Sequence, residues 1–117
     1  MTPNELYENI VKVLDDKKAE DLAVLDTGDL TVVGEYFVIA TGNSSTHVKS
    51  LADDVEYELQ QLGAEPDHIE GRATGWILLD YGSVLVHVFT RDNRDYYNLD
   101  HLWADAKRVD ISDLVTE

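Results

Sequence analysis

Two apolar runs separated by a short turn constrain the fold of this chain more than any other feature. Residues 76–80 (WILLD) and 83–90 (SVLVHVFT) have strand length and are rich in aliphatic and aromatic side chains, with Tyr81-Gly82 between them. A two-residue connection with glycine in second place is typical of a tight β-hairpin. We therefore predict two antiparallel strands over 76–80 and 83–90.

The turn also predicts which side chains share a face. A two-residue loop places Trp76 opposite His87, and side chains alternate along each strand. One predicted face carries Trp76, Leu78, Leu85, His87 and Phe89. The other face is entirely aliphatic, with Ile77, Leu79, Val84, Val86 and Val88. We expect the aliphatic face to pack beneath a helix. The aromatic face is typical of a binding hot spot, although both faces of a central strand pair can also be covered.

Two amphipathic helices are predicted on the N-terminal side of the hairpin. Residues 2–5 (TPNE) read as a capping box with Thr2 as the N-cap, and the charged run 15–20 ends this helix. The second helix starts at Ser44 or Ser45 and carries an apolar stripe from Val48 to Leu62. Gly63 follows where a helix-ending glycine is expected.

The remaining segments complete a single mixed sheet. Residues 21–26 and 35–41 read as strands, and 66–70 fits a short edge strand. Short helical turns are expected after Asp92. The fold class is therefore α/β (α+β): a single-domain mixed β-sheet of about five strands packed by helices. The domain is expected over residues 1–108, and 109–117 form a polar C-terminal tail that we expect to fray.

The length and the net charge of the chain limit the kinds of partner that it can bind. The chain has 117 residues, enough for one domain, and 9 basic against 24 acidic side chains give a net charge of −15. So few cations disfavour direct nucleic-acid recognition and binding to anionic membranes. A basic protein partner is favoured, although a solvated acidic surface explains the charge equally well.

Several kinds of site and location are also disfavoured by composition. Cysteine is absent, which removes disulfides, thiolate metal sites and cysteine nucleophiles. No apolar run reaches the roughly 18 residues of a membrane span. Residues 1–16 lack the basic start and apolar core of a secretory signal, so a cytoplasmic protein is expected.

The sequence contains only weak signals of catalytic chemistry. The four histidines form no close metal-binding pair, and His68-Ile69-Glu70 is a weak candidate. The turn at 42–45 (GNSS) before a helix resembles that of nucleotidyltransferases, whose metal site needs paired carboxylates. Asp67 and Glu70 are three residues apart and would point to opposite strand faces. We therefore expect no metal, no cofactor and no enzymatic activity, with a nucleotidyltransferase-fold nucleotide-binding protein as the alternative.

Five segments in the right order resemble the ribosomal silencing factor family, also called Iojap-related. They are residues 18–26 (KAEDLAVLD), 36–45 (YFVIATGNSS), 70–71 with 76–82 (EG, WILLDYG), 86–89 (VHVF) and 97–106 (YNLDHLWADA). The resemblance implies a nucleotidyltransferase-like fold without the metal carboxylates. It also implies a non-enzymatic factor that binds the large ribosomal subunit through protein uL14. Such a factor blocks an intersubunit bridge and small-subunit joining, and so represses translation, while organelle relatives act in large-subunit assembly.

The resemblance and the hairpin together suggest the contact residues. We expect Trp76 to act as an apolar anchor, and Asp80 and Glu70 to pair with basic side chains of uL14. The rest of the expected partner-binding set is Leu78, Tyr81, Gly82, His87 and Phe89. Family members can be dimeric when free, which leaves a homodimer through the hairpin face open.

Overall fold

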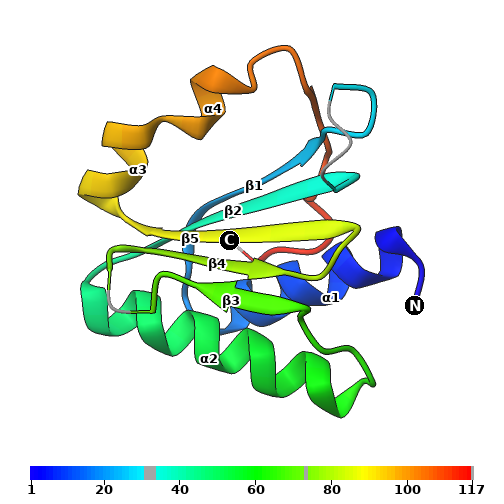
Figure 1. Cartoon of the computed structure of the whole chain (residues 1–117), viewed down its shortest axis with the longest axis horizontal. Coiled ribbons are helices and arrows are strands. Elements are labelled where there is room, and N and C mark those ends of the chain that lie inside the picture. The colour runs from blue at the N-terminus through cyan, green and yellow to red at the C-terminus, as the bar shows by residue number, and fades with distance from the viewer. Residues whose placement is uncertain (31–33, 73, 117) are drawn as a thin grey trace.

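The computed structural model describes residues 1–30, 34–72 and 74–116 of the chain (Figure 1). Its helices are α1 (Pro3–Asp16), α2 (Ser45–Gln61), α3 (Arg91–Tyr97) and α4 (Leu99–Leu102). Its strands are β1 (Glu20–Asp26), β2 (Tyr36–Gly42), β3 (His68–Glu70), β4 (Trp76–Asp80), β5 (Val84–Thr90) and β6 (Lys107–Arg108). The predicted order of helices and strands is confirmed. The strand β6 was not predicted, because a strand of two residues is too short to show a pattern in the sequence.

One mixed sheet forms the centre of the molecule. The strands lie in the order β3-β4-β5-β2-β1-β6. Only β2 and β5, at the centre, run parallel; the other neighbouring strands in the described part of the chain are antiparallel. A parallel pair needs cover on both faces, which explains why β5 is apolar on both sides. The predicted α+β class is confirmed.

The helix α1 begins as the capping box predicts. The hydroxyl of Thr2 accepts a hydrogen bond from the Glu5 N–H at 3.1 Å, and a Glu5 carboxylate oxygen accepts one from the Thr2 N–H at 2.9 Å. Pro3 occupies the first helical position, where its missing N–H costs nothing. Leu6, Ile10 and Leu14 are buried on the side that faces the sheet.

The helix α2 carries the apolar stripe that the spacing predicted. Its N-cap is Ser44, whose side chain accepts a hydrogen bond from the His47 N–H at 3.1 Å. The stripe is buried from Val48 to Leu59, but Leu62 is exposed because the helix ends at Gln61. No helix in the described ranges is long and apolar enough to cross a membrane.

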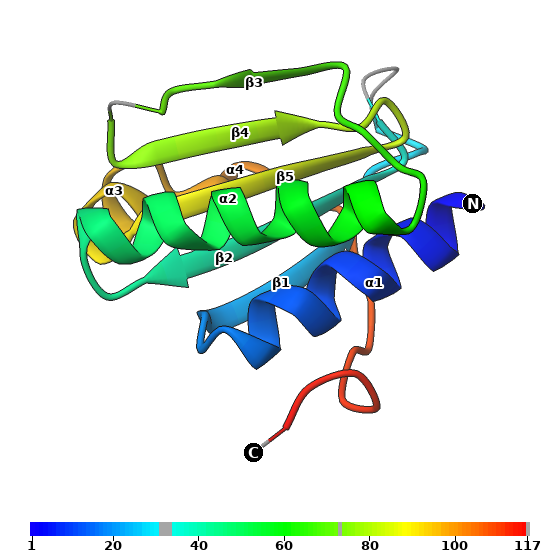
Figure 2. The same cartoon turned by 90° about the horizontal axis from the view of Figure 1, so that it is seen from below.

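Two apolar cores lie on opposite faces of the sheet. The larger core lies between the sheet and the pair α1 and α2, which run side by side (Figure 2). The aliphatic face of the hairpin belongs to this core, as predicted. The smaller core lies beneath the segment formed by α3 and α4, called here the α3–α4 cover (Figure 1).

The segment after β6 packs against the body, so the expected fraying is wrong for residues 109–116. The Val109 N–H donates to the Val24 carbonyl at 2.8 Å, and the Thr116 N–H donates to Asp15 Oδ2 at 3.0 Å. Val109, Ile111, Leu114 and Val115 are half-buried against the larger core. Four apolar side chains in an otherwise polar stretch are enough to hold the segment.

Candidate partner-binding surface

The hairpin between β4 and β5 has another register than the predicted one. Trp76 pairs with Phe89 instead of His87. All the remaining residues of β4 are shifted in the same way: each lies opposite a β5 residue two positions later in the sequence than predicted. A shift of two residues leaves each side chain on its face, because the side-chain period of a strand is two. The predicted faces are therefore confirmed, and the predicted pairs are wrong.

The turn explains the shift in register. Tyr81 is still part of the ladder, since its N–H donates to the Val84 carbonyl at 2.9 Å. The tip is thus Gly82-Ser83, one residue later than expected. Asp80 Oδ1 accepts a hydrogen bond from the Gly82 N–H at 2.7 Å, and Gly82 has a φ of +83°, which suits glycine.

Trp76 is half-buried and held from three directions. Its ring lies 5.0 Å from the ring of Phe89 and 4.6 Å from the ring of Tyr97, measured between centroids. Its indole N–H donates to Nδ1 of His87 at 3.1 Å. The indole therefore has a fixed orientation while part of it remains in contact with solvent.

His87 and Phe89 lie beneath the surface. Phe89 is fully buried and His87 is only 5% exposed. Burial lowers the pKa of His87 to about 4, so the ring is neutral near pH 7. Because Nδ1 accepts from Trp76, the proton is on Nε2, which has no hydrogen-bond partner among the described residues.

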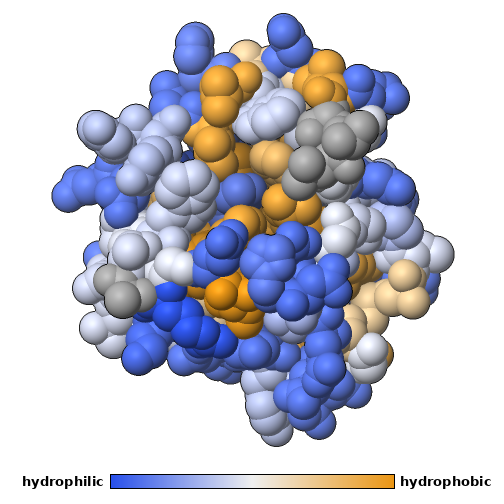
Figure 3. Space-filling view, viewed as in Figure 1, coloured by the Kyte–Doolittle hydropathy of each residue, from blue (hydrophilic) through white to orange (hydrophobic). Residues whose placement is uncertain are grey.

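An acidic rim, formed by the carboxylates of Glu70 and Asp80, borders Trp76 and Leu78. Leu78 is half-buried on β4, and Glu70 lies opposite it on the edge strand β3. His68 lies opposite Asp80, and its Nε2 is 3.5 Å from Asp80 Oδ2 and 3.6 Å from Glu70 Oε2. Figure 3, in the view of Figure 1, shows apolar side chains in the middle of the displayed side of the molecule, with hydrophilic side chains around them.

Tyr81 and Gly82 occupy different positions from the other predicted residues. Tyr81 packs against the larger core on the opposite face, and its hydroxyl is buried without a partner in the described structure. Burial raises the pKa of that hydroxyl strongly. Gly82 is exposed at the hairpin tip. The structure thus brings Trp76, Leu78, Asp80 and Glu70 together, which we call the hairpin surface.

The whole chain, residues 1–117, matches the model of the family described as "Ribosomal silencing factor during starvation". The chain belongs to the ribosomal silencing factor family. This confirms the resemblance, and it supports a ribosome-associated, regulatory role in silencing translation.

Named relatives and a solved structure agree with the ribosomal silencing factor assignment. The chain is 41% identical to the ribosomal silencing factor RsfS of Bacillus subtilis over 112 residues, 95% of each chain. It is 37% identical to RsfS of Halalkalibacterium halodurans over 117 residues, 99% of this chain and all of that one. A crystal structure of a Chromobacterium violaceum protein matches with a TM-score of 0.86 at 36% identity, covering 89% of this chain and 88% of that one.

Two aromatic residues outside the predicted set pack near the hairpin surface of this ribosomal silencing factor or in the core beneath it. Tyr97 on α3 packs on Trp76, and Trp103 packs edge-on against Phe37 at 5.2 Å in the same core. The strand pattern could not show these contacts, because α3 and α4 reach the sheet through tertiary packing. The sequence signal available was the aromatic content of residues 96–103.

The turn that resembles that of nucleotidyltransferases has neither Asp67 nor Glu70 close to it. The turn Gly42-Asn43-Ser44 ends β2, whereas Asp67 precedes β3 and Glu70 ends it. Two strands, β4 and β5, separate β3 from β2, a distance of about 14 Å across the sheet. Within residues 1–30, 34–72 and 74–116, no group of three histidine or carboxylate side chains is placed to hold a metal ion.

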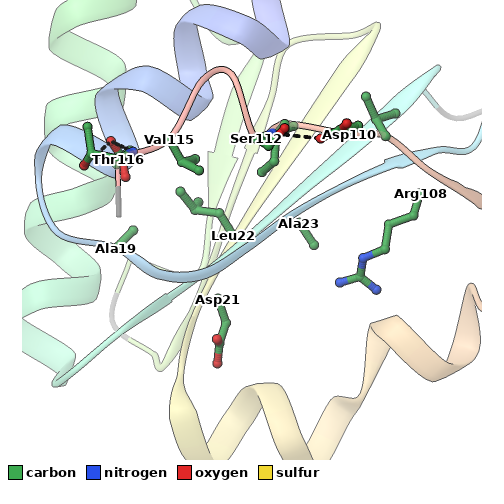
Figure 4. Close-up of a pocket in the computed structure, with 12 residues that line it drawn as sticks. Ala19, Asp21, Leu22, Ala23, Arg108, Asp110, Ser112, Val115 and Thr116 are labelled. Carbon is green, nitrogen blue, oxygen red and sulfur yellow. Dashed lines mark hydrogen bonds between the residues drawn. The ribbon is translucent and has the colours of Figure 1, made fainter.

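A cavity of about 520 Å³ lies away from the hairpin surface. It is bounded by β1 and the segment after β6, with Leu22, Val115 and Asp110 among its lining residues (Figure 4). None of the eight predicted contact residues lines it. Three strand spacings, about 14 Å, separate β1 from β4 in the sheet, so this cavity is not part of the hairpin surface.

Proposed function

We propose that this chain binds the large ribosomal subunit through protein uL14, blocks an intersubunit bridge and small-subunit joining, and thereby represses translation. The family assignment supports a ribosome-associated silencing role. Binding to uL14 and the blocked bridge are the parts that we add to it. The observation that carries the proposal is the hairpin surface, where an oriented aromatic side chain is bordered by carboxylates in a chain of net charge −15.

Trp76 has the properties of a binding anchor. Tryptophan is enriched among the residues that dominate binding energy. Its hydrogen bond to His87 and its stacking against Phe89 and Tyr97 fix the indole before any partner arrives. Little side-chain freedom is then lost on binding, which favours affinity. Leu78 extends the apolar centre, and His87 and Phe89 support it from below.

The acidic rim suits a basic protein. The Glu70 side chain is 65% exposed and the Asp80 side chain 20% exposed. Both carboxylates can pair with lysine or arginine of the partner at the edge of the apolar centre. The net charge steers the chain to basic proteins and away from bare RNA. Binding to uL14 is therefore expected to weaken as the salt concentration rises.

The silencing mechanism requires only tight binding and bulk. A factor seated on the face where the subunits meet excludes the small subunit without any chemical step. We propose that this happens in the cytoplasm. A homodimer of the free protein through the hairpin surface would compete with subunit binding, because it would cover Trp76.

Calorimetric titration of purified uL14 tests the proposed contact. We expect Trp76→Ala to weaken binding about 30-fold or more, as for other tryptophan hot spots. Tyr57→Ala is the matched control, because Tyr57 is an exposed aromatic residue on α2, across the sheet. Equal affinities for Trp76→Ala and the unmodified protein would contradict the proposal.

Two charge-reversal variants test the role of the acidic rim. Asp80→Lys places a cation opposite the basic partner, and we expect at least a ten-fold loss of affinity for uL14. Asp16→Lys makes the same charge change at an exposed position on α1 and should have little effect. If both variants lose affinity equally, net charge and not the hairpin surface governs binding.

A further inference from the structure

Arg94 is a buried cation in this acidic chain. It lies on α3 and is only 7% exposed. A buried charge is tolerated only when it is paired and hydrogen-bonded. Asp100 on α4 supplies the pairing: its Oδ2 accepts from Nε and its Oδ1 from Nη2, each at 3.2 Å. This two-point geometry matches the planar guanidinium fork and is not available to lysine.

The third nitrogen of Arg94 reaches two distant strands. Nη1 donates to the hydroxyl of Thr41 at 2.9 Å and also to the backbone carbonyl of Asp21. Thr41 lies near the end of β2 and is fully buried, and Asp21 lies at the irregularity in the β1–β2 register. We call Arg94 with Asp100, Thr41 and Asp21 the Arg94 clasp. It joins α3, α4, β2 and β1.

The clasp holds the side of the α3–α4 cover that lies over β1 and β2, on the face opposite α1 and α2 (Figure 1). Tyr97 is three residues after Arg94, so the two side chains are neighbours on the same short helix. The Asn98 N–H donates to the Arg94 carbonyl at 2.9 Å and ends α3 at this point. The position of Tyr97 is therefore tied to the clasp.

Tyr97 in turn supports Trp76. Their ring centroids are 4.6 Å apart, and Tyr97 is 46% exposed. A helix of seven residues has little stability of its own, so tertiary contacts must hold it. If the clasp loosens, Tyr97 moves away and the indole of Trp76 loses one of the contacts that orient it.

We propose that Arg94 is a positioning residue for partner binding: the Arg94 clasp fixes the α3–α4 cover so that Tyr97 orients Trp76 on the hairpin surface. The proposal rests on the proposed function, because it assigns the hairpin surface to the ribosomal partner. Arg94 itself is buried and makes no contact with that partner.

Arg94→Lys is the test variant, since lysine retains the charge but lacks the fork. Two readouts are taken on folded protein. The first is the indole N–H resonance of Trp76 in a two-dimensional ¹⁵N NMR spectrum, assigned by its disappearance in Trp76→Phe. The second is affinity for purified large ribosomal subunits. We expect the resonance to shift and its hydrogen exchange to accelerate, and the affinity to fall about ten-fold.

Arg72→Lys is the matched control. Arg72 also binds two carboxylates, Asp53 and Glu56, each at 2.7 Å, but its side chain is 44% exposed and it bridges to α2 on the other side of the sheet. We expect both readouts to be unchanged in this variant. If Arg94→Lys does not fold, Asp100→Asn replaces it, because that change keeps the shape and removes the paired charge.

Two results would overturn the proposal. One is a folded Arg94→Lys protein whose Trp76 indole resonance matches that of the unmodified chain. The other is a displaced resonance with undiminished affinity for subunits that the unmodified chain binds. If the unmodified chain binds no large subunits, the proposed function fails, and the indole readout alone then decides whether the clasp positions Trp76.

Discussion

The indole Nε1 of Trp76 and the imidazole Nδ1 of His87 are joined by a hydrogen bond of 3.1 Å. The bond connects a side chain at the surface to a side chain in the smaller core. It also requires a neutral histidine, because a protonated ring has no acceptor at Nδ1. The orientation of Trp76 and the stability of the fold therefore depend on the same protonation state.

The stability of the protein is expected to fall between pH 6.5 and 4. Burial lowers the pKa of His87 from 6.5 in the unfolded chain to about 4, so below pH 6.5 the unfolded state binds a proton that the folded state does not. Between pH 7.5 and 5.5 this costs about 1 kcal/mol in the free energy of unfolding. Urea unfolding at the two pH values measures it.

The variant His87→Gln should lose this pH dependence. Glutamine does not titrate, so its unfolding free energy should differ less between pH 7.5 and 5.5 than that of the unmodified protein. His101→Gln, at an exposed position on α4, is the control and should retain the dependence. An unchanged pH dependence in His87→Gln would show that other groups cause it.

Removing the indole donor is expected to destabilise the fold only while His87 is present. Trp76→Phe keeps an aromatic ring near Phe89 and Tyr97 but leaves Nδ1 buried and unpaired, which costs about 1 to 2 kcal/mol. In a His87→Phe background, the same change should cost little, since neither polar atom remains. Chemical unfolding of the four proteins in this cycle gives the coupling energy, and a value near zero would contradict the bond.

The capping box makes a measurable contribution to α1. Thr2→Ala removes the hydroxyl that accepts from the Glu5 N–H, and we expect a loss of about 1 kcal/mol in the free energy of unfolding. Thr46→Ala, in the first turn of α2 but not at its N-cap, should change stability by less than about 0.5 kcal/mol. Similar losses in both variants would mean that threonine removal, not the cap, is responsible.

Gly42 is required by close packing at the end of β2. A Cβ at this position would lie 2.9 Å from the backbone nitrogen of Val48 and 2.8 Å from its Cγ2. Because the helix backbone cannot move freely, Gly42→Ala should destabilise the protein by about 1 to 3 kcal/mol in thermal or urea unfolding. At Gly28 the nearest atom is 3.5 Å away, so Gly28→Ala should be tolerated.

The sequence predicted the features that depend on local pattern. Helix periodicity, the capping box of Thr2 and Glu5 and the two faces of the hairpin are all present. The register of the hairpin was wrong because it depends on the turn, where Asp80 binds the Gly82 N–H and moves the tip by one residue. A hydrogen bond from a side chain to the backbone of a turn cannot be predicted from the spacing of apolar residues.

The candidate surface was predictable only in part. Trp76 and Leu78 share a face with Glu70 and Asp80 because alternation along paired strands places them there. Their support by Tyr97 and the clasp at Arg94 depends on contacts between residues up to 73 positions apart. The spacing of residues along the chain cannot predict such contacts, since these segments meet only in the folded sheet.

We propose that the chain silences translation by occupying the large ribosomal subunit. Sedimentation of the protein with purified large subunits on a sucrose gradient, followed by addition of small subunits, tests this mechanism. We predict that the protein travels with large subunits and that the joined-ribosome peak falls, and that Trp76→Ala reverses both effects while Tyr57→Ala does not. A protein that stays at the top of the gradient, with subunit joining unaffected, would contradict the proposed silencing.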